Sequence, residues 1–122
     1  MNANYKQQFY ERVYKHGLMV IGLVEGLPKD QTSKVLGNQL IRSGTSVAAN
    51  VIEAKSASSK KDYINFYHHA LKSANESKLW ICYLRDTKKG DSALINNALK
   101  ETSEIASILA ASIITMKNKR KA

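Results

Sequence analysis

Three histidines are the side chains of this sequence best suited to bind a metal ion. Helical bundles often hold metals through a glutamate followed three residues later by a histidine, and no glutamate here has a histidine at that spacing. His68 and His69 are adjacent, so on a helix they diverge by about 100° and do not face one ion. We therefore predict no metal site, and we expect these two histidines and His16 to lie at the surface or the rim.

Nucleophilic and phosphate-binding motifs are equally absent from the sequence. Cys82 is the single cysteine and has no evident catalytic partner, so we interpret it as a small core residue rather than a nucleophile. No glycine-rich phosphate loop, G-x-S-x-G elbow or Cys-x-x-Cys pair occurs. The sequence predicts no catalytic residue and no cofactor, and we expect the protein not to be an enzyme.

The composition describes one globular domain. The chain has 122 residues, of which 43% are hydrophobic and 24% are charged, and it contains one proline and six glycines. This is enough apolar material for one core and leaves few helix breakers. No apolar run of about 18 residues predicts a membrane span, and no signal-peptide pattern opens the sequence, so we expect no membrane association. A lone cysteine fits a reducing compartment, and we expect the cytoplasm.

Three polar breaks divide the chain into four predicted helices, at residues 4–26, 31–54, 60–88 and 91–117, followed by a basic tail at 117–122. Asp30 or Thr32 is suited to cap the second helix, and Ser59 with Asp62 resembles a capping box for the third. Gly90 fits the end of the third helix, and an aspartate at position 91 fits the start of the fourth.

Apolar residues within these segments recur every three or four positions, which is the pattern of packed helices that cross at roughly 20°. Short loops then make neighbouring helices antiparallel. We predict an all-α fold, a single up-down-up-down four-helix bundle over residues 1–122.

The helix at 60–88 has an unusually wide apolar arc of roughly 200°, against the roughly 100° stripe of a surface helix. Lys78 interrupts the arc, and Leu79 and Tyr83 lie on the opposite side. One interpretation is a wide core face with Lys78 extended to solvent. The other, which we favour because aromatic residues are enriched at interfaces, is a second apolar surface that contacts another subunit.

The charge of the chain is strongly positive, at +9 with a pI near 9.7, and such a chain attracts polyanions. In the predicted bundle the two termini and the 55–61 loop share one end, which collects eight basic and three acidic residues. The other end has five basic and four acidic residues. We expect nucleic acid to bind at the more basic end, and the candidate residues are Lys55, Lys60, Lys61, Lys117, Lys119, Arg120 and Lys121.

Sequence-specific recognition is not predicted, because no helix-turn-helix, zinc finger or RNA-recognition motif occurs. Tyr5, Tyr10 and Tyr14 could stack on unpaired bases. At helical spacing we interpret them instead as packing residues.

Polar residues in the helix at 31–54 indicate contacts between helices that fix their register. Glu76 of the next helix is an available acid for Arg42, and small residues around Gly44 allow helices to approach closely. The candidates for structural polar contacts or an interface are Arg42, Asn50, Glu53, Glu76 and Trp80.

Three motifs resemble the bacterial four-helix bundle family encoded in intervening sequences of large-subunit ribosomal RNA genes, which is related to the accessory variability protein of diversity-generating retroelements. They are R-S-G-T-S-x-x-A-N-x-x-E-A at residues 42–54, S-K-K-D-Y at 59–63 and A-L-K-x-A-x-E-S-x-x-W at 70–80, within a likeness that covers about residues 5–117. Some relatives have glycine after the Asn-x-x-Glu where this chain has Ala54, which suggests a less abrupt helix end.

The resemblance implies a bundle that assembles into a homopentameric ring. It also implies a basic surface that the retroelement relatives use to bind nucleic acid and a reverse transcriptase, and it implies no catalytic residues. Together with the charge, it leads us to expect a non-enzymatic oligomeric scaffold that binds RNA or DNA without strong sequence specificity. The alternative is a protein–protein interaction module with no role in nucleic-acid binding.

Overall fold

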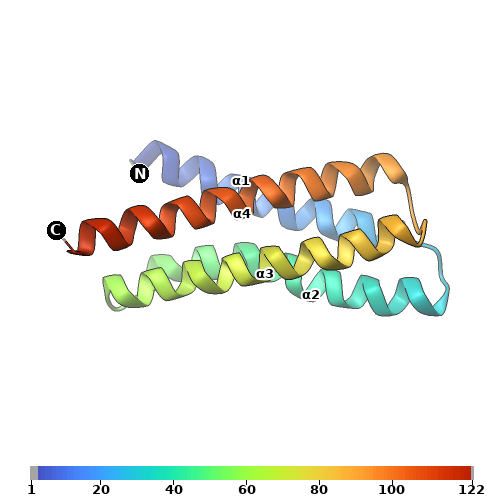
Figure 1. Cartoon of the computed structure of the whole chain (residues 1–122), viewed down its shortest axis with the longest axis horizontal. Helices are drawn as coiled ribbons and strands as arrows, with labels where there is room; N and C mark the ends of the chain where they lie inside the picture. The colour runs from blue at the N-terminus through green and yellow to red at the C-terminus, as the bar shows by residue number, and fades with distance from the viewer. Residues whose placement is uncertain (1–2, 122) are drawn as a thin grey trace.

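Four long helices make up the computed structural model, which describes residues 3–121, with only the backbone of Arg120 and Lys121 (Figure 1). Their bounds are Ala3–Glu25 (α1), Gln31–Glu53 (α2), Lys60–Asp86 (α3) and Ser92–Lys121 (α4), and a short 3₁₀ turn, η1, spans Ala54–Ser56. Neighbouring helices run antiparallel, and the described part of the chain contains no strand. The predicted all-α four-helix bundle is confirmed. None of the helices between residues 3 and 121 is long and apolar enough to span a bilayer.

Side chains of aspartate and serine begin three of the helices as predicted. The Ser33 amide donates to Oδ1 of Asp30 at 2.9 Å, so Asp30 rather than Thr32 caps α2. The Asp62 amide donates to Oγ of Ser59 at 3.1 Å at the start of α3. In a regular capping box the acid would bond the amide of the cap itself, whereas Asp62 accepts from the amide of Ser58 at 3.2 Å. The amide of residue 94 likewise donates to the aspartate at 91 at 3.0 Å.

The end of α3 differs from the prediction that Gly90 terminates it. Lys88 takes the left-handed conformation with φ of 57°. The Lys88 amide donates to the carbonyl of Arg85 at 3.1 Å, and the Lys89 amide donates to that of Leu84 at 2.9 Å. These two bonds form a Schellman motif in which lysine stands where glycine is usual. Gly90 follows with φ of 82°, because the chain needs a second left-handed residue before α4 begins.

The last helix also extends further than predicted. We expected it to end at residue 117, before a basic tail, but α4 continues to Lys121. The segment from Met116 onward contains neither glycine nor proline, so nothing in the local sequence interrupts the backbone hydrogen bonds.

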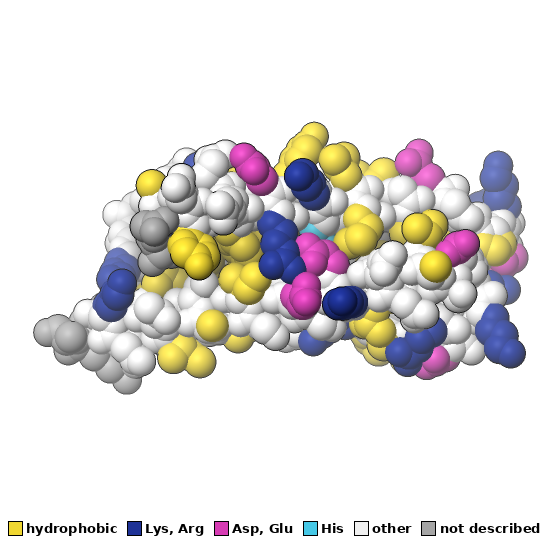
Figure 2. Space-filling view, turned by 90° about the horizontal axis from the view of Figure 1, so that it is seen from above, with side chains coloured by type: hydrophobic (Ala, Val, Ile, Leu, Met, Phe, Trp, Pro, Cys, Tyr) yellow, Lys and Arg dark blue, Asp and Glu magenta, His cyan; other side chains and the backbone are white. Residues whose placement is uncertain are grey.

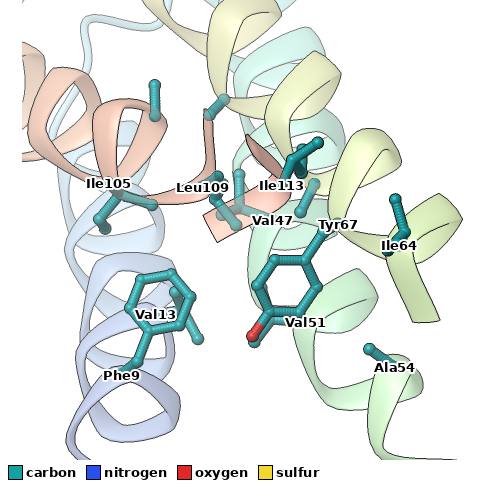
Figure 3. Packing of buried hydrophobic residues seen from close by; sticks show 13 residues of the cluster. Phe9, Val13, Val47, Val51, Ala54, Ile64, Tyr67, Ile105, Leu109 and Ile113 are labelled. Carbon is teal, nitrogen blue, oxygen red and sulfur yellow. The ribbon is translucent and has the colours of Figure 1, made fainter. Parts of the chain in front are cut away.

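Two hydrophobic clusters fill the bundle, one in each half. The cluster near the termini includes Phe9, Val13, Val51, Tyr67 and Leu109, which come from all four helices (Figure 3). The cluster near the other end is built from buried aliphatic residues, among them Val20, Leu40, Ile81, Leu84 and Ile95. The predicted helical spacing therefore does place apolar residues of every helix in the core.

A buried polar layer separates the two clusters, and each helix contributes one residue to it. His16 of α1 and Thr102 of α4 are joined by Nε2 and Oγ1 at 2.8 Å, and the hydroxyls of Ser43 of α2 and Ser77 of α3 lie 2.8 Å apart. All four residues are at most 1% exposed. The prediction that His16 lies at the surface or rim was wrong, because its position in α1 lies on the core face between Val13 and Val20.

Candidate nucleic-acid interface

A cleft of about 910 Å³ opens between α1 and α4 at the end of the bundle that holds both termini. Among neighbouring long helices, α1 and α4 make the least contact, and Figure 1 shows them diverging toward this end. The turn between α2 and α3 closes the cleft from one side through Ala54 and Ala57. Figure 2 shows hydrophobic side chains exposed in this part of the α1–α4 face, with Lys or Arg beside them.

Aromatic side chains form the floor of the cleft. The rings of Tyr63 and Tyr67 are stacked with centroids 5.0 Å apart, and the Tyr63 hydroxyl donates to that of Tyr67 at 3.3 Å. Tyr67 reaches from α3 toward Phe9 of α1, with ring centroids 6.4 Å apart (Figure 3). Burial, followed by the interaction with Tyr63, raises the pKa of Tyr67 well above its ordinary value. The floor of the cleft is therefore an aromatic surface.

Lysine side chains surround this floor. Lys6, Lys55, Lys60 and Lys119 all line the cleft, and all four are exposed. The ammonium of Lys55 lies 4.3 Å from the ring centroid of Tyr10, and that of Lys6 lies 5.8 Å from the centroid of Tyr63. Lysines held over aromatic rings keep their charge at the rim while their stems cover apolar surface.

These lysines are not neutralised by ion pairs within the described side chains. At the opposite end of the bundle, Lys89 pairs with Asp30 at 3.3 Å and Arg85 pairs with Asp86 at 2.8 Å. Residues 3–119 contain no such pair for any of the four lysines of the cleft. The charge at this end therefore remains available to an anionic ligand.

The structure separates the predicted nucleic-acid-binding residues into groups. Lys55, Lys60 and Lys119 line the cleft, whereas Lys61 is exposed and Lys117 half-buried without lining it. The side chains of the other two candidates, Arg120 and Lys121, lie outside the described residues. We did not predict that Lys6 belongs to this site. Its position near the start of the first helix, at the same end of the bundle, could have indicated it.

Arg12 also borders the cleft, but its charge is already paired. Its guanidinium bonds Glu101 at 2.6 and 2.8 Å and Glu104 at 2.8 Å. The hydrogen bonds to Glu101 raise the pKa of Arg12, and the same contact lowers that of Glu101. We assign Arg12 to joining α1 and α4 where the cleft ends rather than to ligand binding.

The predicted contact between Arg42 and Glu76 is present. The Arg42 guanidinium bonds the Glu76 carboxylate and also Oε1 of Gln39, and Trp80 Nε1 donates to Glu76 at 3.1 Å. Partial burial raises the pKa of Glu76, but the hydrogen bonds from Arg42 and Trp80 outweigh it, and the pKa is lowered. This cluster joins α2 to α3 on the outside of the bundle.

The other two residues proposed for polar contacts are not in this cluster. Asn50 donates to the backbone carbonyl of Ser46 at 2.8 Å within α2, and Glu53 is exposed. Within the described part of the chain, neither side chain hydrogen-bonds a neighbouring helix, because Asn50 bonds its own helix and Glu53 faces solvent.

The first-helix tyrosines only partly behave as packing residues. Tyr10 is half-buried against Lys55, but Tyr5 and Tyr14 are each 64% exposed, so the packing interpretation is wrong for these two. Cys82 is half-buried rather than in the core. The described residues contain no group of three or more histidine, cysteine, aspartate or glutamate side chains that could hold a metal ion.

Comparison with known proteins identifies the family. The family model described as 23S rRNA-intervening sequence protein matches residues 5–111. A crystal structure from Bacteroides thetaiotaomicron, described as a protein of unknown function from the S23 ribosomal protein family, is 30% identical with a TM-score of 0.80. The match covers 86% of this chain and 97% of that one. No curated protein is significantly similar. Because the family model covers most of the chain, this protein belongs to the 23S rRNA-intervening sequence protein family.

Proposed function

We propose that this chain is a non-enzymatic scaffold that binds nucleic acid through the basic end of its bundle, without strong sequence specificity. The observation that supports this most is a set of four exposed lysines around one cleft, none of which pairs with a described carboxylate: Lys6, Lys55, Lys60 and Lys119. Phosphates that replace counterions at such a surface gain affinity regardless of base sequence. The family is described by an intervening sequence of 23S rRNA, which agrees with a polyanionic ligand. This description does not distinguish between RNA and DNA as that ligand.

Oligomerisation is part of the proposal. The family resemblance implies a homopentameric ring, and exposed apolar side chains on α3, Leu79 at 46% and Tyr83 at 48%, offer a surface for contact between subunits. A ring of parallel subunits would place several basic ends on one face and strengthen its field. Light scattering measures the mass directly. A monomer at micromolar concentration would contradict this part and leave the binding proposal intact.

Titration of fluorescently labelled RNA and DNA across a salt series tests nucleic-acid binding. We expect binding at low salt whose affinity decreases steeply and linearly on a log–log plot, with little difference between sequences. Absence of binding at low salt, or binding insensitive to salt, would contradict the proposal.

A matched pair of charge-reversal variants locates the surface. K55E/K60E and K29E/K34E each replace two exposed lysines, at opposite ends of the bundle, and so change the net charge equally. The first variant should weaken binding strongly and reduce the salt slope, and the second should have a small effect. Equal effects of the two variants would show that only the total charge matters.

The exposed α3 side chains also favour a second candidate, a protein-interaction module, whose partner could be a reverse transcriptase or another protein. This candidate predicts that K55E/K60E leaves function unchanged while L79E or Y83E removes partner binding. The salt titration and these variants together separate the two candidates.

A further inference from the structure

We infer that the cleft between α1 and α4 takes an unpaired base of a single-stranded nucleic acid, with the neighbouring phosphates on the lysine rim. This rests on the proposed function and specifies its ligand. The observations that carry it are the shape of the cleft, the aromatic floor, the polar groups of the walls and the position of the lysines.

The size and floor of the cleft suit a flat aromatic group. Its volume of about 910 Å³ lies within the roughly 300–1,000 Å³ of sites for small ligands. Tyr63 is only half-buried although it stacks on Tyr67, so part of its ring faces the cleft. A base that stacks on this part takes the place of the exposed Lys6 side chain, whose ammonium lies 5.8 Å from the ring centroid. Stacking on aromatic side chains accepts every base, which agrees with binding that is not sequence-specific.

The lining of the cleft also carries hydrogen-bonding groups. Gln8 of α1, Ser59 at the start of α3, and Ser112 and Thr115 of α4 all line the cleft. These amide and hydroxyl groups can bond the polar edge of a base, which displays both donors and acceptors. A hydrocarbon chain would offer no hydrogen bond to the Gln8 amide or to the hydroxyls of Ser112 and Thr115, so the lining favours a base over the acyl chain of an anionic lipid.

The four lysines lie around the opening of the cleft, where the sugar–phosphate backbone of a bound strand would pass. Lys6 and Lys55 are held over Tyr63 and Tyr10, and Lys60 and Lys119 lie on the other elements that border the opening. A base that enters the cleft therefore leaves its flanking phosphates among positive charges from α1, η1, α3 and α4. A base pair inside a duplex cannot enter, because its faces are stacked on its neighbours and its polar edges are paired.

Three probes with the same number of phosphates test the inference at one low salt concentration: a single-stranded RNA, a blunt duplex of half its length, and an abasic strand of the same length. We expect the full chain to bind the single strand about tenfold more tightly than the other two, which is the effect of one stacked base. Equal affinity for all three would overturn the inference while leaving the proposed function standing. Absence of binding to every probe would overturn both.

Variants show whether the cleft itself is responsible. A111W places a large ring in the cleft from an exposed position on α4, and A93W makes the same change at the far end of that helix. A111W should remove the tenfold preference and leave binding to the abasic strand unchanged, and A93W should alter neither. Y63F should keep the preference because the ring remains, whereas Y63L should lose most of it.

Two further outcomes would overturn the inference. If A111W changes the solution mass of the protein, a second copy of the chain occupies the cleft. The other outcome concerns oleate. If oleate displaces the normal and the abasic strand equally, and A111W abolishes oleate binding, the cleft is a site for an anionic amphiphile.

Discussion

Nε2 of His16 on α1 lies 2.8 Å from Oγ1 of Thr102 on α4, in the buried polar layer between the two hydrophobic clusters of the bundle. Nδ1 of the same imidazole is buried without a hydrogen-bond partner in the described structure. If Nε2 carries the proton and donates to the threonine, Nδ1 presents only a lone pair, which costs less to bury than an unpaired N–H. Protonation of the imidazole would therefore bury a positive charge and an unpaired Nδ1–H.

We expect the stability of the protein to decrease as the pH falls below about 6.5. Burial, opposed by the charge of Glu101, lowers the pKa of His16, so between that value and about 6.5 the unfolded chain binds more protons than the fold. The contribution of His16 to stability is complete above this window and is lost by up to about 1.4 kcal/mol for each pH unit within it. Urea unfolding at pH 7, 6 and 5 measures the loss. The half-buried carboxylates of Glu76 and Glu101 have pKa values below the ordinary glutamate value, so they titrate below this range.

H16Q should flatten this dependence, since glutamine can still bond Thr102 and does not titrate. H69Q is the matched control, because His69 is exposed, and it should retain the dependence. An unchanged slope in H16Q would show that another group is responsible.

The two serines of the polar layer should respond unequally to alanine. The Ser77 hydroxyl donates to the carbonyl of Ser73 at 2.8 Å, so the Ser43 hydroxyl donates to Ser77. S77A leaves a buried hydroxyl unpaired and should cost about 1–3 kcal/mol. S43A leaves Ser77 its bond to Ser73 and should cost about 0.5–1.5 kcal/mol. The double variant should lose less than the sum of the two, and strict additivity in a double-mutant cycle would argue that the hydroxyls do not interact.

Gly44 should not tolerate alanine, unlike a second helical glycine. A Cβ at Gly44 would lie 2.7 and 2.9 Å from the two Cγ atoms of Val20, so G44A should destabilise the fold by about 1–3 kcal/mol through overpacking. A Cβ at Gly22 would meet no atom within 4 Å, so G22A should stabilise α1 by about 0.5–1 kcal/mol. Thermal unfolding compares the two variants, which should shift the melting temperature in opposite directions.

The turn after α3 offers a stabilising substitution. Lys88 has φ of 57°, which costs a residue with a Cβ about 1–2 kcal/mol, so K88G should stabilise the protein by about 1 kcal/mol. G90A should destabilise it, because φ is 82° there and a Cβ would lie 2.9 Å from Cδ2 of Leu27. A loss of stability in K88G would mean that the lysine side chain makes a compensating contact.

The sequence by itself determined the helices, the side chains that cap their N-terminal ends, and which end of the bundle collects the lysines. These features depend on local rules: apolar residues every three or four positions, an oxygen side chain at Asp30 or Ser59 before a helix, and short connections that reverse the chain. The Arg42–Glu76 contact was also accessible, because helical register brings an acid and a base onto facing sides of neighbouring helices.

Only the tertiary structure decided how the buried polar residues pair and where the cleft opens. The sequence did not predict the burial of His16, because a histidine is expected at the rim of a core unless a polar partner lies opposite it. That partner, Thr102, lies on α4 and is brought to His16 only by the packing of the helices. The cleft arises from the divergence of α1 and α4, which depends on packing between helices distant in sequence. Charge summed over one end of the bundle did not predict which lysines surround an aromatic floor, because that choice is set by interhelical geometry and not by spacing along the chain.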